Sequence, residues 1–402
     1  MSKACSPKRT IEVLQEFSIP LISGVIVAIA WANLSSHSYH SFLHASLFGA
    51  KHGINFHFLV NDIFMVFFFG IATKEITESL LPGGALNPMK KAITPILGTL
   101  GGVVMPIIVY LAWVWFSGDQ SIINGWGIPT ATDIALAWLV ARQVFGKGHP
   151  AISFLLLLAI ADDGIGLFII AVFYPDPHNP VQPIYLLLVC VGMLLAYGLR
   201  KMRVKSYWPF LFGGGIFSWC GLYFSHLHPA LALVSIVPFM PASKHDEGIF
   251  IESEGGEDVH EVSVLSRFEK ELKLPVDIGL FCFGLANAGV EFSSIGNATY
   301  AVFLGLAIGK TFGVFSFAFV GYRVFGFPLP TGMDLKSLFV AGSVASIGLT
   351  VALFVAGVAF TDLELQGAAK MGALFSAFLS IVAISLGRIF KVHNTLAIQR
   401  GL

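Results

Sequence analysis

Residues 125–174 read GWGIPTATDIALAWLVARQVFGKGHPAISFLLLLAIADDGIGLFIIAVFY and contain two strongly apolar segments. Asp133 nevertheless lies inside the first segment, and the adjacent pair Asp162 and Asp163 lies inside the second. A carboxylate at the centre of a membrane helix costs roughly 2.5–3.5 kcal/mol on insertion scales, so three of them need a functional explanation. We therefore predict that these acids form an ion and proton site, and that the rest of the chain builds a scaffold around it.

The composition is that of a membrane protein. The chain has 402 residues, of which 55% are hydrophobic and 12% are charged, with a mean hydropathy of +0.79. A soluble domain carries about 25% charged residues, so a large soluble core is excluded. The formal net charge of zero argues against a nucleic-acid partner. The four cysteines lack metal-ligand spacing, and no cofactor is expected.

About twelve apolar segments approach the ~20 residues that a membrane-spanning helix needs. They are residues 11–32, 58–80, 92–116, 125–141, 151–173, 183–199, 208–224, 229–240, 274–292, 298–322, 335–360 and 367–389. The eighth is short enough to be a partial span. The first has no cleavage site after it, so we interpret it as a membrane helix rather than a signal peptide. The sequence thus predicts an all-α polytopic membrane protein with a single transporter domain over residues 1–402.

The Lys and Arg residues support this division of the chain. Lys51 and Lys370 fall on the outer face, Lys74 and Lys310 fall within segments, and the remaining Lys and Arg residues fall on the inner face. Cytoplasmic loops carry such an excess of basic residues, so both termini are predicted to be cytoplasmic.

Two loops are long. The outer one, residues 33–57, carries five histidines without acidic or cysteine co-ligands, so a polar interfacial loop is favoured over metal binding or external pH sensing. The inner one, residues 243–273, contains the acidic run HDEGIFIESEGGEDVHE, which is typical of a solvated linker, with regulation or partner docking as the alternative.

Two segments carry signs of an interrupted helix. Gly125, Gly127 and Pro129 weaken helix propagation just before Asp133, and polar Thr residues surround it. The counterpart is GSVASIGLT at 342–350, whose small residues alone would indicate only close helix packing. The two interruptions occupy matching places if segments three to five and ten to twelve are inverted repeats. Such matched breaks indicate a transporter site, with two broken helices crossing at mid-membrane.

The buried charges predict the chemistry of that site. Asp162 and Asp163 point about 100° apart on a helix, so they cannot both face one partner. Lys310, deep in the tenth segment, requires a carboxylate partner or balances the carboxyl ends of the broken helices; both roles are compatible. Two neighbouring carboxylates titrate as a coupled unit, and a small cation can replace their protons. Oxygen ligands from Asp163, Asp162 and Thr132 suit Na+ or Li+ better than a soft metal.

The sequence resembles the NhaA-type bacterial sodium/proton antiporters over nearly the whole chain, a family that is itself a known example of inverted repeats with broken helices. The shared motifs are Asn61-Asp62, GWGIP at 125–129, ATDIA at 131–135, Ala159-Ile160 with Asp162-Asp163, LANAGV at 285–290, Gly309-Lys310, and Ile347-Gly348 with Thr350. The resemblance implies electrogenic exchange of sodium for protons, serving pH and sodium homeostasis in the bacterial inner (cytoplasmic) membrane. It leaves a homodimer open, because the outer loop is shorter than the family's hairpin-bearing loop.

The resemblance also implies residue roles. Asp163 would be the primary ion- and proton-binding carboxylate, and Asp162 its neighbour that pairs with Lys310. Asp133 and Thr132 would lie at the helix crossing, with Asp133 balancing the half-helix amino ends.

Three further positions correspond to residues along the family's ion pathway. Asp62 looks like an outer-facing acid, Glu75 like the inner-funnel glutamate, and His228 like a pH-related histidine. Thr77 and Glu78 replace two basic residues of the family pattern, so the exchange core is better supported than inherited pH regulation.

Two other functions remain as alternatives. A sodium-coupled symporter of an organic solute would use a related fold, although no intramembrane Arg is available to hold a substrate carboxylate. An intramembrane aspartyl protease needs two carboxylates that face each other from different helices, whereas this pair is adjacent on one helix. We therefore predict a transporter rather than an enzyme.

Overall fold

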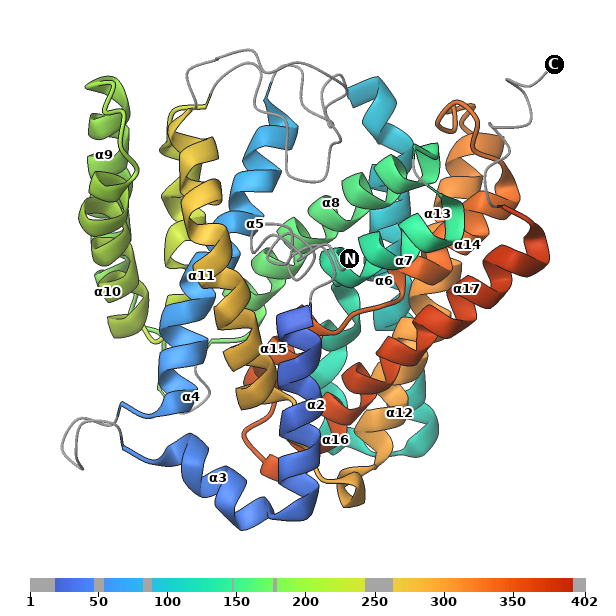
Figure 1. Ribbon diagram of the computed structural model, residues 1–402, viewed down its shortest axis with the longest axis horizontal. Helices are drawn as coiled ribbons and strands as arrows, with labels where there is room; N and C mark the ends of the chain where they lie inside the picture. Colours follow the sequence, from blue (N-terminus) through green and yellow to red (C-terminus); the bar gives the residue numbers. More distant parts are fainter. Residues whose placement is uncertain are drawn as a thin grey trace, which may run out of the picture. The chain divides into compact units, whose positions relative to one another are not determined.

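A computed structural model describes residues 19–46, 54–81, 89–146, 148–175, 179–242 and 263–392 (Figure 1). The acidic run predicted to be a linker lies outside these residues. Within the described ranges the chain is helical apart from connecting segments, and the only β-type pairing is an isolated bridge between Ser46 and Asn55. The all-α prediction is therefore confirmed.

Six of the described helices are long and apolar enough to cross a membrane, or up to seven if a bent pair counts as one span. The six are Phe56–Leu80, Ala92–Ser117, Pro150–Phe173, Pro183–Lys201, Asn297–Arg323 and Leu363–Phe390. The bent pair is Leu335–Ala345 with Thr350–Ala359, and the shorter apolar helices are Ile19–Leu34, Ile134–Phe145, Phe210–Phe224 and Pro229–Phe239. Helices thus coincide with the predicted apolar segments, while the count of twelve crossings remains a prediction.

The ninth segment begins earlier than its hydropathy indicates. Helix α11 (Val264–Asn287) starts about three turns before residue 274, inside the predicted inner loop. Charged residues occupy this first part of the helix, and Glu269 is buried there because it pairs with Lys74. A hydropathy argument misses this extension because an ion pair, rather than apolar side chains, holds it in place.

The chain divides into two compact units. The first comprises Met1–Ser41, Ile93–Gly166 and Leu280–Leu402, and the second comprises Phe42–Ala92 and Leu167–Gly279. The first unit includes the predicted repeats.

The first unit contains two series of helices in the same order: a long helix, a helix broken in the middle, and another long helix. The first series is α6 (Met89–Ser117), η2 (Gln120–Thr130) with α7 (Ile134–Phe145), and α8 (Pro150–Phe173), which continues past the unit boundary. The second is α12 (Asn297–Leu304), η8 (Gly305–Lys310) and α13 (Thr311–Arg323), then α14 (Leu335–Ala345) with α15 (Thr350–Ala359), then α16 (Leu363–Phe375), η9 (Ser376–Phe378) and α17 (Leu379–Phe390). This order agrees with the predicted repeats.

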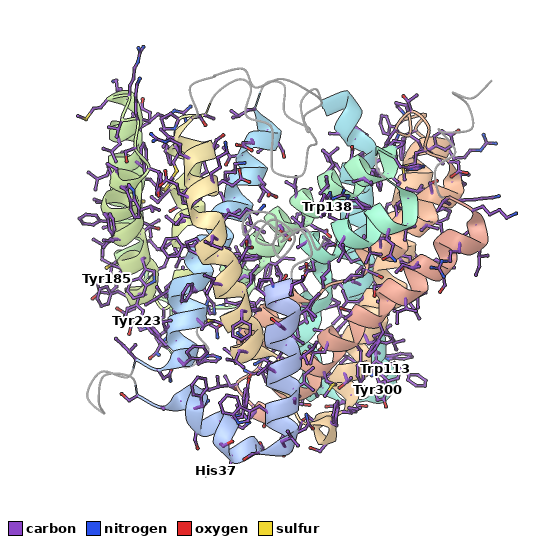
Figure 2. All side chains as sticks on the ribbon, in the orientation of Figure 1. His37, Trp113, Trp138, Tyr185, Tyr223 and Tyr300 are labelled. Carbon is purple, nitrogen blue, oxygen red and sulfur yellow. The ribbon has the colours of Figure 1, made fainter. Side chains whose placement is uncertain are left out.

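Helices α6 and α13 pack with their backbones in direct contact. A Cβ atom added to Gly101 would lie 2.1 Å from the carbonyl oxygen of Gly313, and one added to Gly313 would lie 2.1 Å from that of Gly101. Only glycine permits this approach, which brings Lys310, at the end of η8 directly before α13, close to α6. Near the carboxyl end of α6, the rings of Trp113 and Tyr300 lie 5.8 Å apart, and this contact joins α6 to α12 (Figure 2).

The second unit is built around α5 (Met65–Leu80), which follows α4 (Phe56–Phe58) and the π-helical turn η1 (Leu59–Phe64). It also contains η3 (Pro183–Tyr185), α9 (Leu186–Lys201), η4 (Phe210–Gly215), α10 (Ile216–Phe224), η5 (Pro229–Ser235), η6 (Val237–Phe239) and the first part of α11. The Trp219 indole donates a hydrogen bond of 2.8 Å to the Asp62 carbonyl, which joins α10 to η1. Helices α2 (Ile19–Leu34) and α3 (Ser36–His44) and the short 3-10 turn η7 (Phe292–Ser294) complete the described helices.

Candidate functional site

The first helix break lies directly before α7. Ala131 and Asp133 adopt extended backbone conformations between η2 and α7. The stretch with Gly125, Gly127 and Pro129 forms a 3-10 helix as far as Thr130, and the predicted interruption follows it. Pro129 has no N–H group to donate, so a helix that includes it loses one hydrogen bond close to this end.

The Asp133 carboxylate accepts hydrogen bonds from the amino ends of two half-helices. Its Oδ1 atom accepts a hydrogen bond of 3.0 Å from the Leu136 N–H in the first turn of α7. Its Oδ2 atom lies 3.2 Å from the Thr350 N–H at the start of α15. The second break, residues 346–349, bends α14 and α15 by 47°, and its Ile347 carbonyl accepts the Asp133 N–H at 2.8 Å. A carboxylate is favourable at each amino end because unpaired N–H groups and the helix dipole both point at it.

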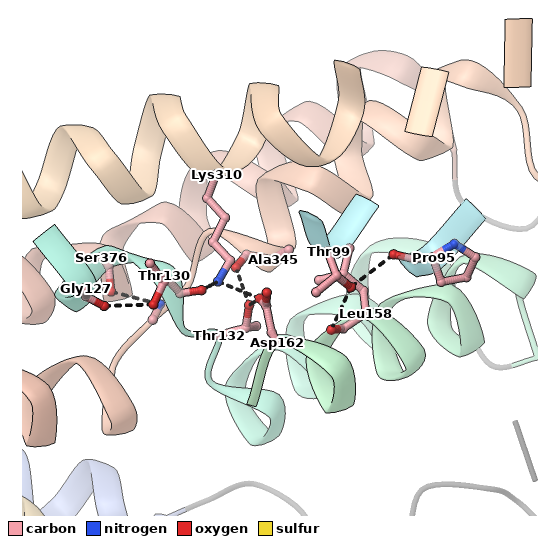
Figure 3. Close-up of polar contacts among 11 residues, drawn as sticks. Pro95, Thr99, Gly127, Thr130, Thr132, Leu158, Asp162, Lys310, Ala345 and Ser376 are labelled. Atoms are coloured by element: carbon pink, nitrogen blue, oxygen red, sulfur yellow. Dashed lines mark hydrogen bonds and ion pairs between the residues drawn. The ribbon is translucent and has the colours of Figure 1, made fainter. Parts of the chain in front are cut away.

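The side chains of Lys310 and Thr132 contact the carboxyl ends of the other two half-helices, η2 and α14. The Lys310 ammonium donates a 2.6 Å hydrogen bond to the Thr130 carbonyl, the last residue of η2 (Figure 3). The Thr132 hydroxyl lies 3.1 Å from the Ala345 carbonyl at the end of α14. The two breaks therefore lie against each other. The Asp133 carboxylate lies at the two amino ends, and the Lys310 ammonium and the Thr132 hydroxyl each lie at one carboxyl end, so every end faces a group that its partial charge favours.

Asp162 joins this cluster from α8. Its Oδ2 atom lies 2.7 Å from the Lys310 ammonium and 2.7 Å from the Thr132 hydroxyl (Figure 3). Both charged side chains of this ion pair are 0% exposed. Lys310 therefore has both predicted roles at once, since it pairs with a carboxylate and balances a helix carboxyl end.

Asp163 is set apart from its neighbour. It retains 7% exposure, and Asp162 is the member of the pair that contacts Lys310. This separation agrees with the prediction that consecutive residues on a helix cannot face one partner. The cluster thus contains two adjacent carboxylates, of which Asp162 is ion-paired with Lys310.

The other predicted site residues belong to the second unit. Asp62 lies in η1, Glu75 lies in α5 and is buried, and the half-buried His228 immediately precedes η5. Because Lys74 and Glu78 lie near a helix end, the sequence predicts that they reach the membrane interface or pair with each other. Only the pairing occurs: Lys74 is fully buried and contacts both Glu78, at 2.5 Å, and Glu269. In the described ranges, no three His, Cys, Asp or Glu side chains form a group that could hold a metal ion.

Several groups that contact the breaks could not be predicted from the sequence. The Ser376 hydroxyl accepts a 3.2 Å hydrogen bond from the Gly348 N–H, and two of the other partners are backbone carbonyls, those of Thr130 and Ala345. A serine in an apolar helix ordinarily bonds its own helix, as Ser376 also does with Ala373 at 2.6 Å. Its second contact depends on how distant segments pack.

A family model described as Na+/H+ antiporter 1 matches residues 9–387. The chain belongs to this family. A relative from Geobacter sulfurreducens named Na(+)/H(+) antiporter NhaA is 58% identical over 387 residues, covering 96% of this chain and 99% of the relative. One of the same name from Desulfitobacterium hafniense is 58% identical over 394 residues, covering 97% and 99%. The resemblance to NhaA-type proteins is thereby confirmed, and the family is one of transporters rather than enzymes.

A solved structure of another antiporter has a similar fold. The sodium proton antiporter MjNhaP1 from Methanocaldococcus jannaschii matches with a TM-score of 0.54 and 15% identity, covering 92% of this chain and 91% of that one. At this level of identity the likeness concerns the fold alone. It supports a polytopic helical transporter architecture.

Proposed function

We propose that this protein is a secondary active antiporter that exchanges Na+ or Li+ for protons across the cytoplasmic membrane of a bacterium. The observation that carries the proposal is the buried cluster at the meeting point of the two broken helices. There, Asp162 is held by Lys310 and Thr132, with Asp163 next to it. This is a site at which a small cation and protons compete for the same carboxylates.

The residues of the cluster have distinct tasks in this exchange. A cation binds to Asp163, Asp162 and the Thr132 hydroxyl, which are hard oxygen ligands. Asp162 cannot ligate it fully while Lys310 holds its Oδ2 atom, so cation entry loosens that ion pair. Lys310 stays connected to the Thr130 carbonyl and therefore remains near the site. When the cation leaves, protons take its place on the carboxylates, and the ion pair of Asp162 with Lys310 forms again once Asp162 has released its proton.

The engaged partner of Asp162 also argues against proteolysis. An aspartyl protease shares a proton between two carboxylates on different helices, whereas Asp162 contacts an ammonium and a hydroxyl.

We infer that both termini are cytoplasmic, because basic residues concentrate on that side. Exchange of unequal charge would make transport electrogenic and suit it to pH and sodium homeostasis.

The test is proton movement in inside-out membrane vesicles from cells that lack their own antiporters. An internal pH dye is followed after addition of Na+, Li+ or K+ at several pH values from mildly acidic to alkaline. We expect Na+ and Li+ to release protons from vesicles with the wild-type protein. The absence of any cation-dependent signal at all pH values would refute the assignment.

Asp163→Asn provides the sharper test. This change keeps the size of the side chain but removes its charge, so exchange should be lost while the protein still accumulates in the membrane. Glu364→Gln is the matched control, because Glu364 is an exposed carboxylate in the first turn of α16. Exchange retained by Asp163→Asn would show that another carboxylate carries the ion.

A further inference from the structure

Lys370 is a buried ammonium that the exchange cycle does not use. The distribution of Lys and Arg along the sequence places it on the outer face, and in the structure Lys370 lies within α16 and is only 6% exposed. Its ammonium donates a 3.0 Å hydrogen bond to the Gln366 side-chain oxygen, one turn earlier. No carboxylate in the described part of the chain pairs with it. An unpaired charge in a membrane helix is costly and indicates a function.

Gln366 connects this ammonium to the carboxyl end of α15. The amide of Gln366 donates hydrogen bonds to the carbonyl oxygens of Gly357, at 2.9 Å, and Phe360, at 3.2 Å. Lys370 approaches the same place directly, because a Cβ atom added to Gly357 would lie 3.9 Å from Lys370 Cε. These carbonyls have no partner within the helix, and a positive charge beside them is favourable.

The opposite end of α15 is part of the candidate site. Its first N–H group, that of Thr350, lies 3.2 Å from the Asp133 carboxylate. Seven residues separate Thr350 from Gly357, which is about 10 Å along an α-helix. Helix α15 is thus held between a carboxylate at the cation site and an ammonium at its far end.

The other half-helices show the same arrangement at their far ends. Asp119 caps the start of η2 and Asp334 caps the start of α14, each by accepting a backbone N–H. Arg142 lies in the last turn of α7, where it stacks on the Trp138 ring at 4.5 Å. Lys370 differs from these three residues because it is buried. If its charge is removed, water cannot take over its interaction with the carboxyl end of α15.

We propose that Lys370, acting through Gln366, is a positioning residue for cation binding: it fixes α15 along its axis and so keeps Thr350 on Asp133 at the helix crossing. This inference rests on the proposed antiport function. Without the ammonium, the bonds of Gln366 to the carboxyl end weaken and α15 can shift. The crossing then loosens and cation affinity falls. The carboxylates that bind the cation lie on α8, so turnover at saturating Na+ is retained.

The test compares variants of the full-length protein in proteoliposomes, with the apparent KM for Na+ and the maximal rate measured separately. Lys370→Met and Gln366→Leu should each raise KM about three- to tenfold, the range expected for loss of a partly buried helix-end charge. Their maximal rates should stay within about twofold of wild type. Lys370→Arg keeps the charge and should restore a near wild-type KM. Lys336→Met, at an exposed lysine of α14, is the matched control and should change nothing.

An unchanged KM in a folded Lys370→Met protein would overturn the inference. A lower maximal rate and lower melting temperature with KM unchanged would also overturn it, because that pattern marks a merely structural role. If Lys370→Met does not accumulate, Lys370→Gln takes its place with the same expectation. A wild type that exchanges no cation would instead refute the antiport function, and Na+-dependent thermal stabilisation of the same variants would then decide the role of Lys370.

Discussion

Replacing Asp133 with Asn tests the view that one carboxylate serves two half-helices. The Asp133 oxygens face the Leu136 N–H at 3.0 Å and the Thr350 N–H at 3.2 Å, and the side chain is buried. An asparagine retains one acceptor oxygen but turns an NH2 group toward the second helix end. A buried charge at one helix end contributes up to about 2 kcal/mol, so the loss at two ends should reach about 2–4 kcal/mol.

Asp334→Asn is the matched control for this prediction. Asp334 is exposed and caps a single helix, α14, through one 2.7 Å bond from the Ser337 N–H. Asparagine is as good a cap there as aspartate, so the control should lose well under 1 kcal/mol. Both variants are unfolded by denaturant in the same detergent, with tryptophan fluorescence as the signal. Equal midpoints for the two variants would refute the double-capping argument.

Two further predictions concern charges away from the helix crossing. Lys74→Met leaves the carboxylates of Glu78 and Glu269 buried without their ammonium, so it should destabilise the protein by about 3–5 kcal/mol in denaturant unfolding, whereas the exposed Lys270→Met should cost almost nothing. For Asp334, partial burial acts to raise the pKa, but hydrogen bonds from the first turn of α14 outweigh it and hold the pKa below its usual value. Because the folded pKa is the lower one, this cap contributes stability above the unfolded value of about 3.9 and loses it as pH falls through the folded value. Acid unfolding should therefore be less steep in Asp334→Asn; an identical pH dependence would contradict the assigned cap.

Much of the architecture follows from local sequence. Apolar length predicts the helices, and small residues beside Thr350 and Asp133 predict two interruptions whose contact the structure then shows. The cost of burying an ammonium predicts that Lys310 has a carboxylate partner, the resemblance to the antiporter family implies that this partner is Asp162, and the structure pairs the two. In each of these cases the prediction rests on residues that are rarely buried unless a partner is present.

The features that escape prediction depend on packing between distant segments. The 3-10 geometry that carries η2 through Gly127 and Pro129 is invisible to a rule that treats both residues as helix breakers. The contacts of Lys370 also escape prediction, because its ammonium bonds the Gln366 side chain, which in turn bonds two carbonyl groups, and hydropathy registers none of these contacts. The helical start of α11 escapes for the same reason, because Glu269 is buried by an ion pair across helices.

The shared use of Asp133 and Lys310 has an electrical consequence. A helix end carries a partial charge of about half an elementary charge, so two amino ends offset one carboxylate and two carboxyl ends offset one ammonium. At the crossing the two amino ends offset Asp133, and the two carboxyl ends, one contacted by Lys310 and the other by the Thr132 hydroxyl, offset Lys310, so Asp162 and Asp163 are left with two negative charges. Two protons would bring this remainder to zero, whereas one Na+ would leave a single negative charge. The membrane voltage would therefore act differently on the two loaded forms, and the direction of exchange would respond to it.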